Sequence, residues 1–353
     1  MCNVKSWDVI IVGAGIIGLS LSFELRKRGA SVLIVERGEP ARESSHAAAG
    51  MLVGASAETL PPLRSLAAAS AAMYPEFVHE LQDESGLKCD LRQHGTIHVA
   101  DNIEDMGDAE PLDHAALLEL EPALKINRPA FLIKESSVDP RALCAAALKA
   151  AFHRGVTVTS GNEVQELLVS DGRVSGVRTQ STTYASHTVV NCAGCWAAQL
   201  PPFKIPTRPI KGQMLSLAGH SKDLLRHAVR ASQIYLVPRS DGRMLAGATV
   251  EDVGYDKHTV PETIQHMHRA AIDLVPALSH SRILEDWAGL RPGTPDRLPI
   301  LGPTSIPGYF AATGHLRDGI LLAPITAKIM AAVISGQAPE YDISAFSPMR
   351  FQL

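Results

Sequence analysis

Three glycines near the N-terminus have the spacing of a dinucleotide-binding turn. Gly13, Gly15 and Gly18 form G-x-G-x-x-G directly after the expected strand 8–12, which is apolar from Val9 onward, and Glu36 follows a second apolar run, residues 32–35. In such a βαβ unit the first glycine permits a tight turn, the second lets the backbone approach a pyrophosphate, and the third lets helix and strand pack closely. Unpaired N–H groups at the helix N-terminus attract the diphosphate, and Glu36 can accept hydrogen bonds from ribose hydroxyls. The pattern therefore predicts an adenine dinucleotide site, the alternative being glycines that serve packing alone.

A second stretch that could do chemistry is GHLRDGILLAP, residues 314–324. A strand is expected over residues 309–312, a polar turn after it, and an apolar helix from Gly319 to about Ser335. The N-terminus of that helix would carry about half a positive charge. Whether the dinucleotide is NAD or FAD is left open by the glycine motif; Arg317 would add a cation, so this turn could stabilise a reduced flavin. The alternative is that Arg317 and Asp318 pair and cap the helix.

Together these stretches resemble the FAD-dependent amino-acid oxidase superfamily, and more narrowly the glycine oxidases of the thiamine pathway. The matching segments run through the whole chain: VGAGIIGLSLSFELRKRG, SSHAAAGML, GATVED, DWAGLRPGTPDRLPILGP and GHLRDGILLAP. The resemblance implies an α/β fold, with a Rossmann-type FAD-binding domain of the glutathione-reductase kind and an inserted α+β substrate domain built on a large antiparallel sheet. We expect the FAD-binding domain in residues 1–85, 135–205 and 285–353, and the substrate-binding domain in residues 86–134 and 206–284.

The resemblance also implies noncovalent FAD as the cofactor. The small residues of the AAAG loop would lie on the N5 side of the flavin, and Val164 would lie against the adenine. His46 raises the alternative of a covalent flavin link, but its register differs by one residue from that of relatives with such a link. The residues expected to contact FAD are Gly13, Gly15, Ile16, Ile17, Gly18, Glu36, Arg37, Ser44, Ser45, Ala48, Ala49, Gly50, Met51, Val164, Cys192, Ala193, Gly194, Trp196, Arg291, His315, Arg317, Asp318, Gly319 and Ile320.

A small zwitterionic substrate needs a fixed cation for its carboxylate. Arg291 follows the expected strand 283–290, so its guanidinium can emerge at the strand end and bind a carboxylate through two parallel hydrogen bonds. The resemblance places the family's carboxylate-binding arginine at this position, the alternative being a surface ion pair with Asp286 or Asp296. Tyr235 matches a family tyrosine that assists the carboxylate, the alternative being a core tyrosine.

Two positions depart from the glycine oxidase pattern. Gln233 stands where a His is expected, and Val250 stands where a Met is expected. Both residues would line the site, so both bear on which substrate side chains are tolerated. The expected catalytic set is Arg291, Tyr235, Gln233, Val250 and Arg317.

These residues predict oxidative deamination by positioning rather than by a strong base. Arg291 would hold a small amino acid with its Cα–H toward flavin N5, hydride transfer would give an imine, and molecular oxygen would take up the electrons as hydrogen peroxide. Glycine would yield glyoxylate and ammonia, or an imine for thiamine thiazole synthesis. The alternatives are a broader D-amino-acid or sarcosine-type oxidase or dehydrogenase, and a noncatalytic dinucleotide-binding protein.

Composition excludes several other classes of function. The 353 residues carry a net charge of -4 with scattered Lys and Arg, so no nucleic-acid partner is expected. The N-terminus shows neither a signal-peptide pattern nor a membrane anchor, which predicts a cytoplasmic protein with no membrane partner; a homo-oligomer is left open. Cys192 and Cys195, in CAGC, fit buried thiols better than a zinc site. His266 and His268 cannot share a helix face, so no metal is expected.

Local signals predict the elements that must position these groups. A helix over about 63–86 leads to a strand over 95–100 and to an acidic loop over 101–110, which is expected to be a solvated surface. Asp139 is the expected N-cap of a helix that ends at Gly155. A hairpin turns at Asp171-Gly172, and a strand over about 187–192 follows it. The segments RPIKGQMLSL, QIYLVPRSDGRMLAGAT and RILEDWAGLRP are expected to form one sheet, with a helix over 261–276 between the last two.

Overall fold

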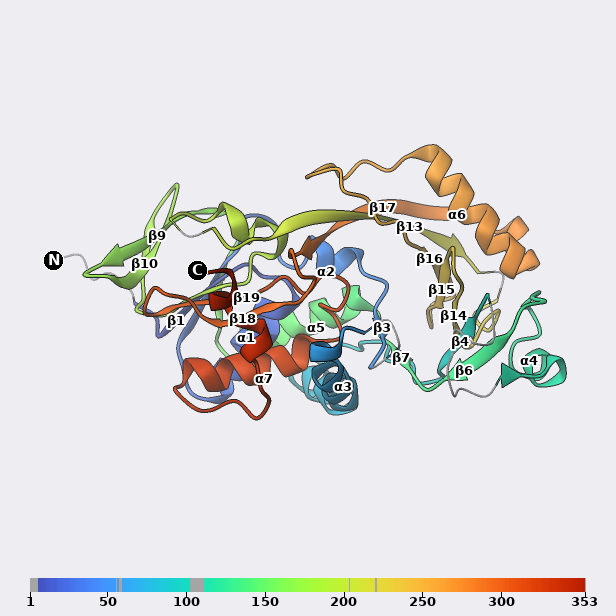
Figure 1. Cartoon of the computed structure of the whole chain (residues 1–353), viewed down its shortest axis with the longest axis horizontal. Helices are drawn as coiled ribbons and strands as arrows, with labels where there is room; N and C mark the ends of the chain where they lie inside the picture. The colour runs from blue at the N-terminus through green and yellow to red at the C-terminus, as the bar shows by residue number, and fades with distance from the viewer. Residues whose placement is uncertain are drawn as a thin grey trace.

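The computed structural model describes residues 6–54, 56, 59–101, 111–202, 204–219 and 221–352. Figure 1 shows an elongated molecule with a six-stranded sheet and its helices toward one end and an eight-stranded sheet toward the other. Two long strands, β13 (Arg208–Ala218) and β17 (Ile283–Gly293), run along one side from the first part to the second. None of the helices in the described ranges has the length and hydropathy that a bilayer crossing requires.

The six-stranded sheet has the order β18-β19-β12-β1-β2-β8, and its neighbours pair in parallel except for β18 and β19. Every residue of β1 and β2 is buried. Burial on both faces explains why these strands read as unbroken apolar runs rather than as alternating ones. The strands are β1 (Val9–Val12), β2 (Val32–Val35), β8 (Thr157–Thr159), β12 (Val189–Asn191), β18 (Ile300–Pro303) and β19 (Tyr309–Thr313).

Different layers cover the two faces of this sheet. Val9, Ile11, Val32 and Ile34 pack with the helices α1 (Ile16–Lys27), α3 (Arg64–Ser85), α5 (Pro140–His153) and α7 (Ala323–Ile334). The residues that alternate with them pack against a three-stranded antiparallel sheet of β9 (Val164–Ser170), β10 (Arg173–Thr179) and β11 (Thr183–Ala185). Helices on one face and a small antiparallel sheet on the other confirm the expected α/β class.

Two local signals set the ends of elements near the cavity described below. Asp139 caps α5 as expected, since its carboxylate accepts hydrogen bonds from Arg141 N (2.9 Å) and Ala142 N (3.4 Å). The expectation for α7 is wrong at its start: the helix begins at Ala323, and residues 319–322 form turns. Pro324 explains the difference, because a proline ring is tolerated in the first turn of a helix but clashes with the preceding turn further inside it.

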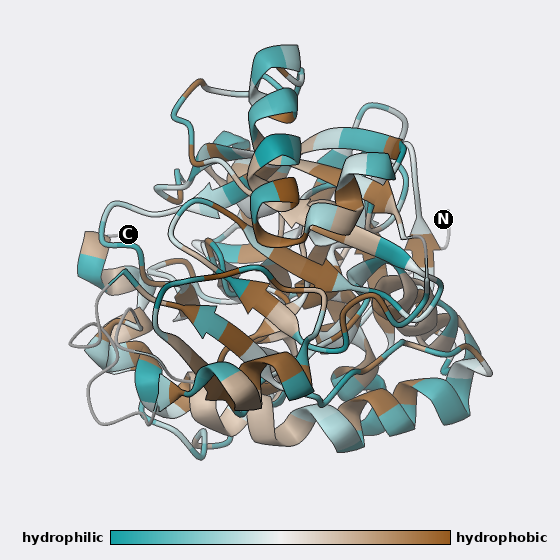
Figure 2. Ribbon diagram, turned by 90° about the vertical axis from the view of Figure 1, so that its right-hand side faces the viewer, coloured by the Kyte–Doolittle hydropathy of each residue, from teal (hydrophilic) through white to brown (hydrophobic). Residues whose placement is uncertain are grey.

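The eight-stranded sheet has the order β17-β13-β16-β15-β14-β4-β6-β5, and of its described pairs β14–β4 is parallel. The helix α6 (Pro261–Leu274) packs on one face of this sheet. Figure 2 shows hydrophobic residues along the strands and hydrophilic ones on the outward surfaces of the helices. The remaining strands are β4 (Thr96–Val99), β5 (Pro111–Leu112), β6 (Ala130–Ile133), β14 (Ala228–Arg230), β15 (Tyr235–Pro238) and β16 (Arg243–Gly247). The three sequence segments expected to share one sheet do so.

Smaller elements complete the chain. Between the two large sheets lie the short helix α2 (Ser44–Ala47) and the strand pair β3 (Met51–Leu52) and β7 (Ser136–Ser137) (Figure 1). The helix α4 (His114–Leu120) lies beside β6. The expected acidic loop lies outside the described residues except for Asp101, which is exposed, and Cys2 also lies outside them. The other cysteines are free and buried, as expected.

We expect Asp139→Ala to destabilise the protein by about 2 kcal/mol, because it removes the α5 cap and one of the two carboxylates that pair with Arg243, leaving only Asp241. Asp113→Ala is the matched control, since Asp113 caps α4 through Ala116 N (2.7 Å) at an exposed site. Urea unfolding of both variants measures the loss of unfolding free energy. Equal losses for the two variants would show that the pair of Asp139 with Arg243 adds nothing to the cap.

Candidate active site

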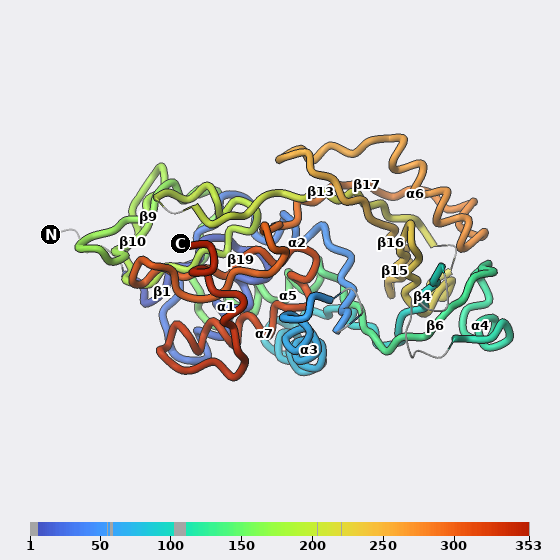
Figure 3. Tube along the Cα trace, viewed as in Figure 1, coloured from blue at the N-terminus to red at the C-terminus, as the bar shows by residue number. Residues whose placement is uncertain are grey.

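A cavity of about 670 Å³ is lined by both large sheets and by the loops between them. Its volume falls within the range of small-molecule and cofactor sites. In Figure 3 the chain around α2, early in the sequence, lies beside β13 and β17, so the walls come from distant parts of the chain. With the exception of Gly18, all residues expected to contact FAD line this cavity.

The glycine-rich turn shapes one end of the cavity. Gly13 has φ +104°, and a Cβ there would lie 2.7 Å from Cys192 O. A Cβ on Gly18 would lie 2.1 Å from Gly13 O, so Gly18 serves close packing behind the turn, which is the role expected of the third glycine. Glu36 holds the turn from the side: its carboxylate accepts hydrogen bonds from Ala14 N (2.8 Å) and Gly38 N (2.9 Å). This end therefore presents backbone and one carboxylate, as an adenosine diphosphate requires.

A planar cation lies next to this end. The Arg37 guanidinium stacks 3.6 Å from the centre of the Trp196 ring and pairs with Glu43 at 2.9 Å. Trp196 in turn packs 5.7 Å from the Tyr255 ring. Arg37 and Trp196 both line the cavity, so the stack fixes a rigid wall there.

Donors from three distant parts of the chain hold the end of α2 and the loop that follows it. Trp287 Nε1 on β17 donates to Ala47 O (3.1 Å), Arg239 Nη2 donates to Ala49 O (2.5 Å), and Arg141 Nε on α5 donates to His46 O (3.4 Å). A Cβ on Gly289, also on β17, would lie 2.3 Å from Ala47 Cβ. The small-residue loop is therefore fixed against the sheet, and Ala47 through Gly50 line the cavity.

The turn before α7 forms another part of the cavity wall. His315 is buried and its Nε2 lies 3.1 Å from Thr326 Oγ1. Burial lowers the pKa of His315 to about 3, so the imidazole is neutral at physiological pH. From α3, Ser70 Oγ donates to Leu321 O (2.6 Å) and the Tyr74 hydroxyl donates to Ile320 O. These two side chains fix the turn, and no signal in the sequence pointed to them.

Arg291 occupies the other end of the cavity. β17 continues through it to Gly293, so the expected strand end at Leu290 is wrong, because Arg291 stays paired in register with Ile210. Its Nη1 donates to Thr249 O (3.0 Å) and Lys211 O (3.3 Å), and the missing side chain of Gly212 leaves room for the guanidinium. Burial lowers the pKa of Arg291, and nearby Tyr235 offsets only part of this shift.

Arg291 has no carboxylate within ion-pair distance among the described residues. Asp296 pairs instead with Arg350 (2.7 Å), and Asp286 accepts a hydrogen bond from Thr259. Neither surface ion pair considered for Arg291 is therefore present. The Tyr235 hydroxyl donates to Met214 Sδ (3.1 Å), and burial raises its pKa, so the phenol stays protonated.

Of the two residues that depart from the glycine oxidase pattern, Val250 lines the cavity and Gln233 does not. Gln233 is exposed and does not line the cavity, contrary to expectation, because it lies in the connection before β15 begins at Tyr235. Val250 lines the cavity but is 74% exposed, so it stands at an opening. Sequence reasoning missed lining residues on β13, β14 and β17, among them Gly212, Met214, Arg230 and Gly289. In the described chain, no three His, Cys, Asp or Glu residues are grouped to hold a metal ion.

The comparisons with known proteins agree with this geometry. Residues 8–333 match the DAO family, described as FAD dependent oxidoreductase, and the chain belongs to this family. Its cofactor is FAD, and the open glycine turn, the Glu36 carboxylate and the fixed small-residue loop fit that elongated group. Glycine oxidase from Geobacillus kaustophilus is 32% identical over 98% of this chain and 97% of its own length. The crystal structure of that protein matches with a TM-score of 0.92 over 98% of this chain.

Other relatives have additional parts or other names. The bifunctional protein ThiO/ThiG of Trichormus variabilis is 36% identical over 98% of this chain, which spans only 55% of that protein. The hydrogen cyanide synthase subunit HcnC of Pseudomonas aeruginosa is 32% identical over 99% of this chain and 97% of its own length. The family is thus established, whereas the reaction must be argued from the site.

We expect Gly289→Ala to weaken FAD binding by about tenfold or more, because the added methyl group would collide with Ala47 and push the cavity loop away from β17. Titration of the FAD-free protein with FAD, followed by flavin fluorescence, measures the dissociation constant. An unchanged constant would show that the contact with Ala47 does not position the loop.

The neutral His315 should make the protein less stable as the pH falls. Because its pKa is lower in the folded state than in the unfolded state, where it is near 6.5, its contribution is complete above pH 6.5 and is lost progressively toward pH 3. Between pH 6.5 and 5 the wild type should lose about 2 kcal/mol relative to His315→Gln. Urea unfolding of the two proteins across this range measures the difference, and parallel curves would be inconsistent with a neutral, buried imidazole.

Proposed function

We propose that the chain oxidises a small amino acid, with glycine as the first candidate, to the imine, which hydrolyses to glyoxylate and ammonia. The observation that carries the proposal is the Arg291 guanidinium, which lines the cavity without a carboxylate partner in the described chain. A substrate carboxylate would complete its hydrogen bonding through two parallel bonds. The similarity to glycine oxidases over nearly the whole chain supports the same reaction class.

The residues of this chain would act by positioning. Arg291 binds the carboxylate, and the carbonyls of Lys211 and Thr249 keep its guanidinium oriented. The protonated Tyr235 hydroxyl offers a further hydrogen bond, and Arg317 adds positive charge to the same cavity. FAD would supply the hydride acceptor, and with molecular oxygen as electron acceptor the second product would be hydrogen peroxide. Residues 47–50 are held in place by hydrogen bonds, so the wall against which the substrate is aligned is rigid.

Two further parts of the proposal concern which substrates are accepted and which pathway uses the product. The exposed Val250 and the absence of Gln233 from the wall favour a broader D-amino-acid or sarcosine-type oxidase or dehydrogenase as the second candidate. The similarity to the bifunctional protein ThiO/ThiG supports a product that feeds thiamine thiazole synthesis. In this proposal residues 1–85, 135–205 and 285–353 bind FAD, and the others bind the substrate.

We expect Arg291→Ala to lower kcat/KM at least about a hundredfold, since it removes a charged bidentate contact. A peroxide-coupled assay with glycine, sarcosine, D-alanine and D-proline measures it, with an artificial electron acceptor in place of oxygen as a second format for a dehydrogenase. Arg269→Ala, on the outer side of α6, is the control that should not change the rate. Equal rates for Arg291→Ala and the wild type would remove Arg291 from the site.

A further inference from the structure

A second arginine lines the substrate end of the cavity. Arg230 is the last residue of β14 and is paired in register with Tyr235 on β15 and with His98 on β4. Directly opposed residues on neighbouring strands lie on the same face of a sheet, with Cβ atoms about 5 Å apart. All three of these residues line the cavity. The alternating residue Val229 instead packs in the core with α6, so Arg230 faces the cavity side.

Within the described ranges, the guanidinium of Arg230 lacks the partners that a structural arginine would have. Its Nε is buried without a hydrogen-bond partner among the described residues, and no carboxylate among them forms an ion pair with it. The neighbouring lining carboxylate, Asp101, is already held by Arg128 at 2.8 Å and lies 3.3 Å from Ser232 Oγ. A buried donor left unpaired is costly, so this arrangement favours an anionic ligand at Arg230.

The cavity also continues beyond the space that a two-carbon substrate needs. Past Tyr235 its wall is formed by the ends of β4 and β14 and by the residues that follow them, including Val99, Ala100 and Ser232. Arg291 and Tyr235 lie close enough for each to shift the pKa of the other. In the sheet order β17-β13-β16-β15-β14, Arg291 is on the β17 side of Tyr235, so the first carboxylate is expected on that side. Arg230 lies on the opposite, β14, side of the same tyrosine.

We propose that Arg230 binds a second acidic group of the substrate, so that the preferred substrate class is an amino acid with two carboxylates, one on the α-carbon and one on the side chain or the nitrogen substituent. This inference rests on the proposed function, because it needs Arg291 to hold the first carboxylate. A cation on each side of Tyr235 selects for length as well as charge, since both carboxylates must be reached together.

The test compares one- and two-carboxylate ligands on the FAD-loaded protein. Flavin absorbance is titrated with acetate and propionate and with malonate, succinate and glutarate, which gives binding without turnover. Oxidation is measured for glycine and D-alanine against iminodiacetate, D-aspartate and D-glutamate. In the wild type at least one dicarboxylate should exceed its monocarboxylate counterpart about tenfold in affinity and in kcat/KM.

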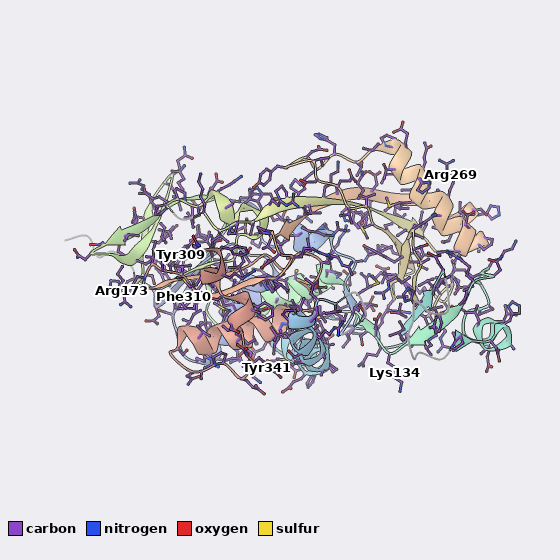
Figure 4. The ribbon with its side chains drawn as sticks, viewed as in Figure 1. Lys134, Arg173, Arg269, Tyr309, Phe310 and Tyr341 are labelled. Atoms are coloured by element: carbon purple, nitrogen blue, oxygen red, sulfur yellow. The ribbon has the colours of Figure 1, made fainter. Side chains whose placement is uncertain are left out.

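Arg230→Met should reduce this preference about tenfold to a hundredfold, and Arg230→Lys should restore part of it, because lysine keeps the charge without the planar donor pair. Arg269→Met is the matched control. Figure 4 shows Arg269 on α6, on the outside of the molecule, and it should leave the preference unchanged. FAD content and thermal unfolding of each variant check that the fold is intact.

The outcomes separate this inference from the function on which it rests. If amines are oxidised but dicarboxylates show no preference, or keep it in Arg230→Met, the role of Arg230 is wrong and the oxidase remains. If no amine is oxidised and Arg291→Ala changes no ligand affinity, the proposed function fails, and the inference fails with it.

Discussion

The contact between strand β17 and the end of α2, from which the small-residue loop continues, is the constraint on which the rest of the site depends. Gly289 lies so close to Ala47 that a single methyl group could not be added, and Trp287 donates to the carbonyl of Ala47 (3.1 Å). Arg291 follows on the same face of the strand, because alternate residues of a strand share a face. One rigid element therefore sets the distance between the loop that lines the cofactor cavity and the guanidinium that faces its other end.

The surrounding polar groups keep this arrangement from relaxing. Carbonyl groups at the end of α2 and in the loop after it accept hydrogen bonds from Arg141, Trp287 and Arg239, and the carbonyl groups that accept from Arg291 belong to residues 211 and 249. Such donors and acceptors are in place before a ligand arrives, so little reorganisation is needed when charge develops in the cavity. Small residues permit the approach and long side chains from neighbouring elements fix it, which explains why glycines and arginines recur around one cavity.

Local signals in the sequence predicted the local structure well. The apolar runs and glycine spacing gave β1, α1 and β2, and the residue types at Asp139 and Asp171-Gly172 gave a cap and a turn. The start of α7 was misplaced although Pro324 marks it. The exposure of Gln233 and the position of Arg230 were missed because they depend on the pairing of strands distant in sequence, and β14 has only three residues. The cofactor and the role of Arg291 came from the family resemblance, since no local pattern determines what faces a cavity.

The most direct test of the account is a crystal structure of the FAD-loaded protein with glycolate, a carboxylate that lacks the reactive amine. The account predicts that both carboxylate oxygens lie within hydrogen-bonding distance of the Arg291 guanidinium, and that the flavin ring lies between this ligand and residues 47–50. Glycolate bound away from Arg291, or a flavin ring outside the space between that loop and β17, would contradict it.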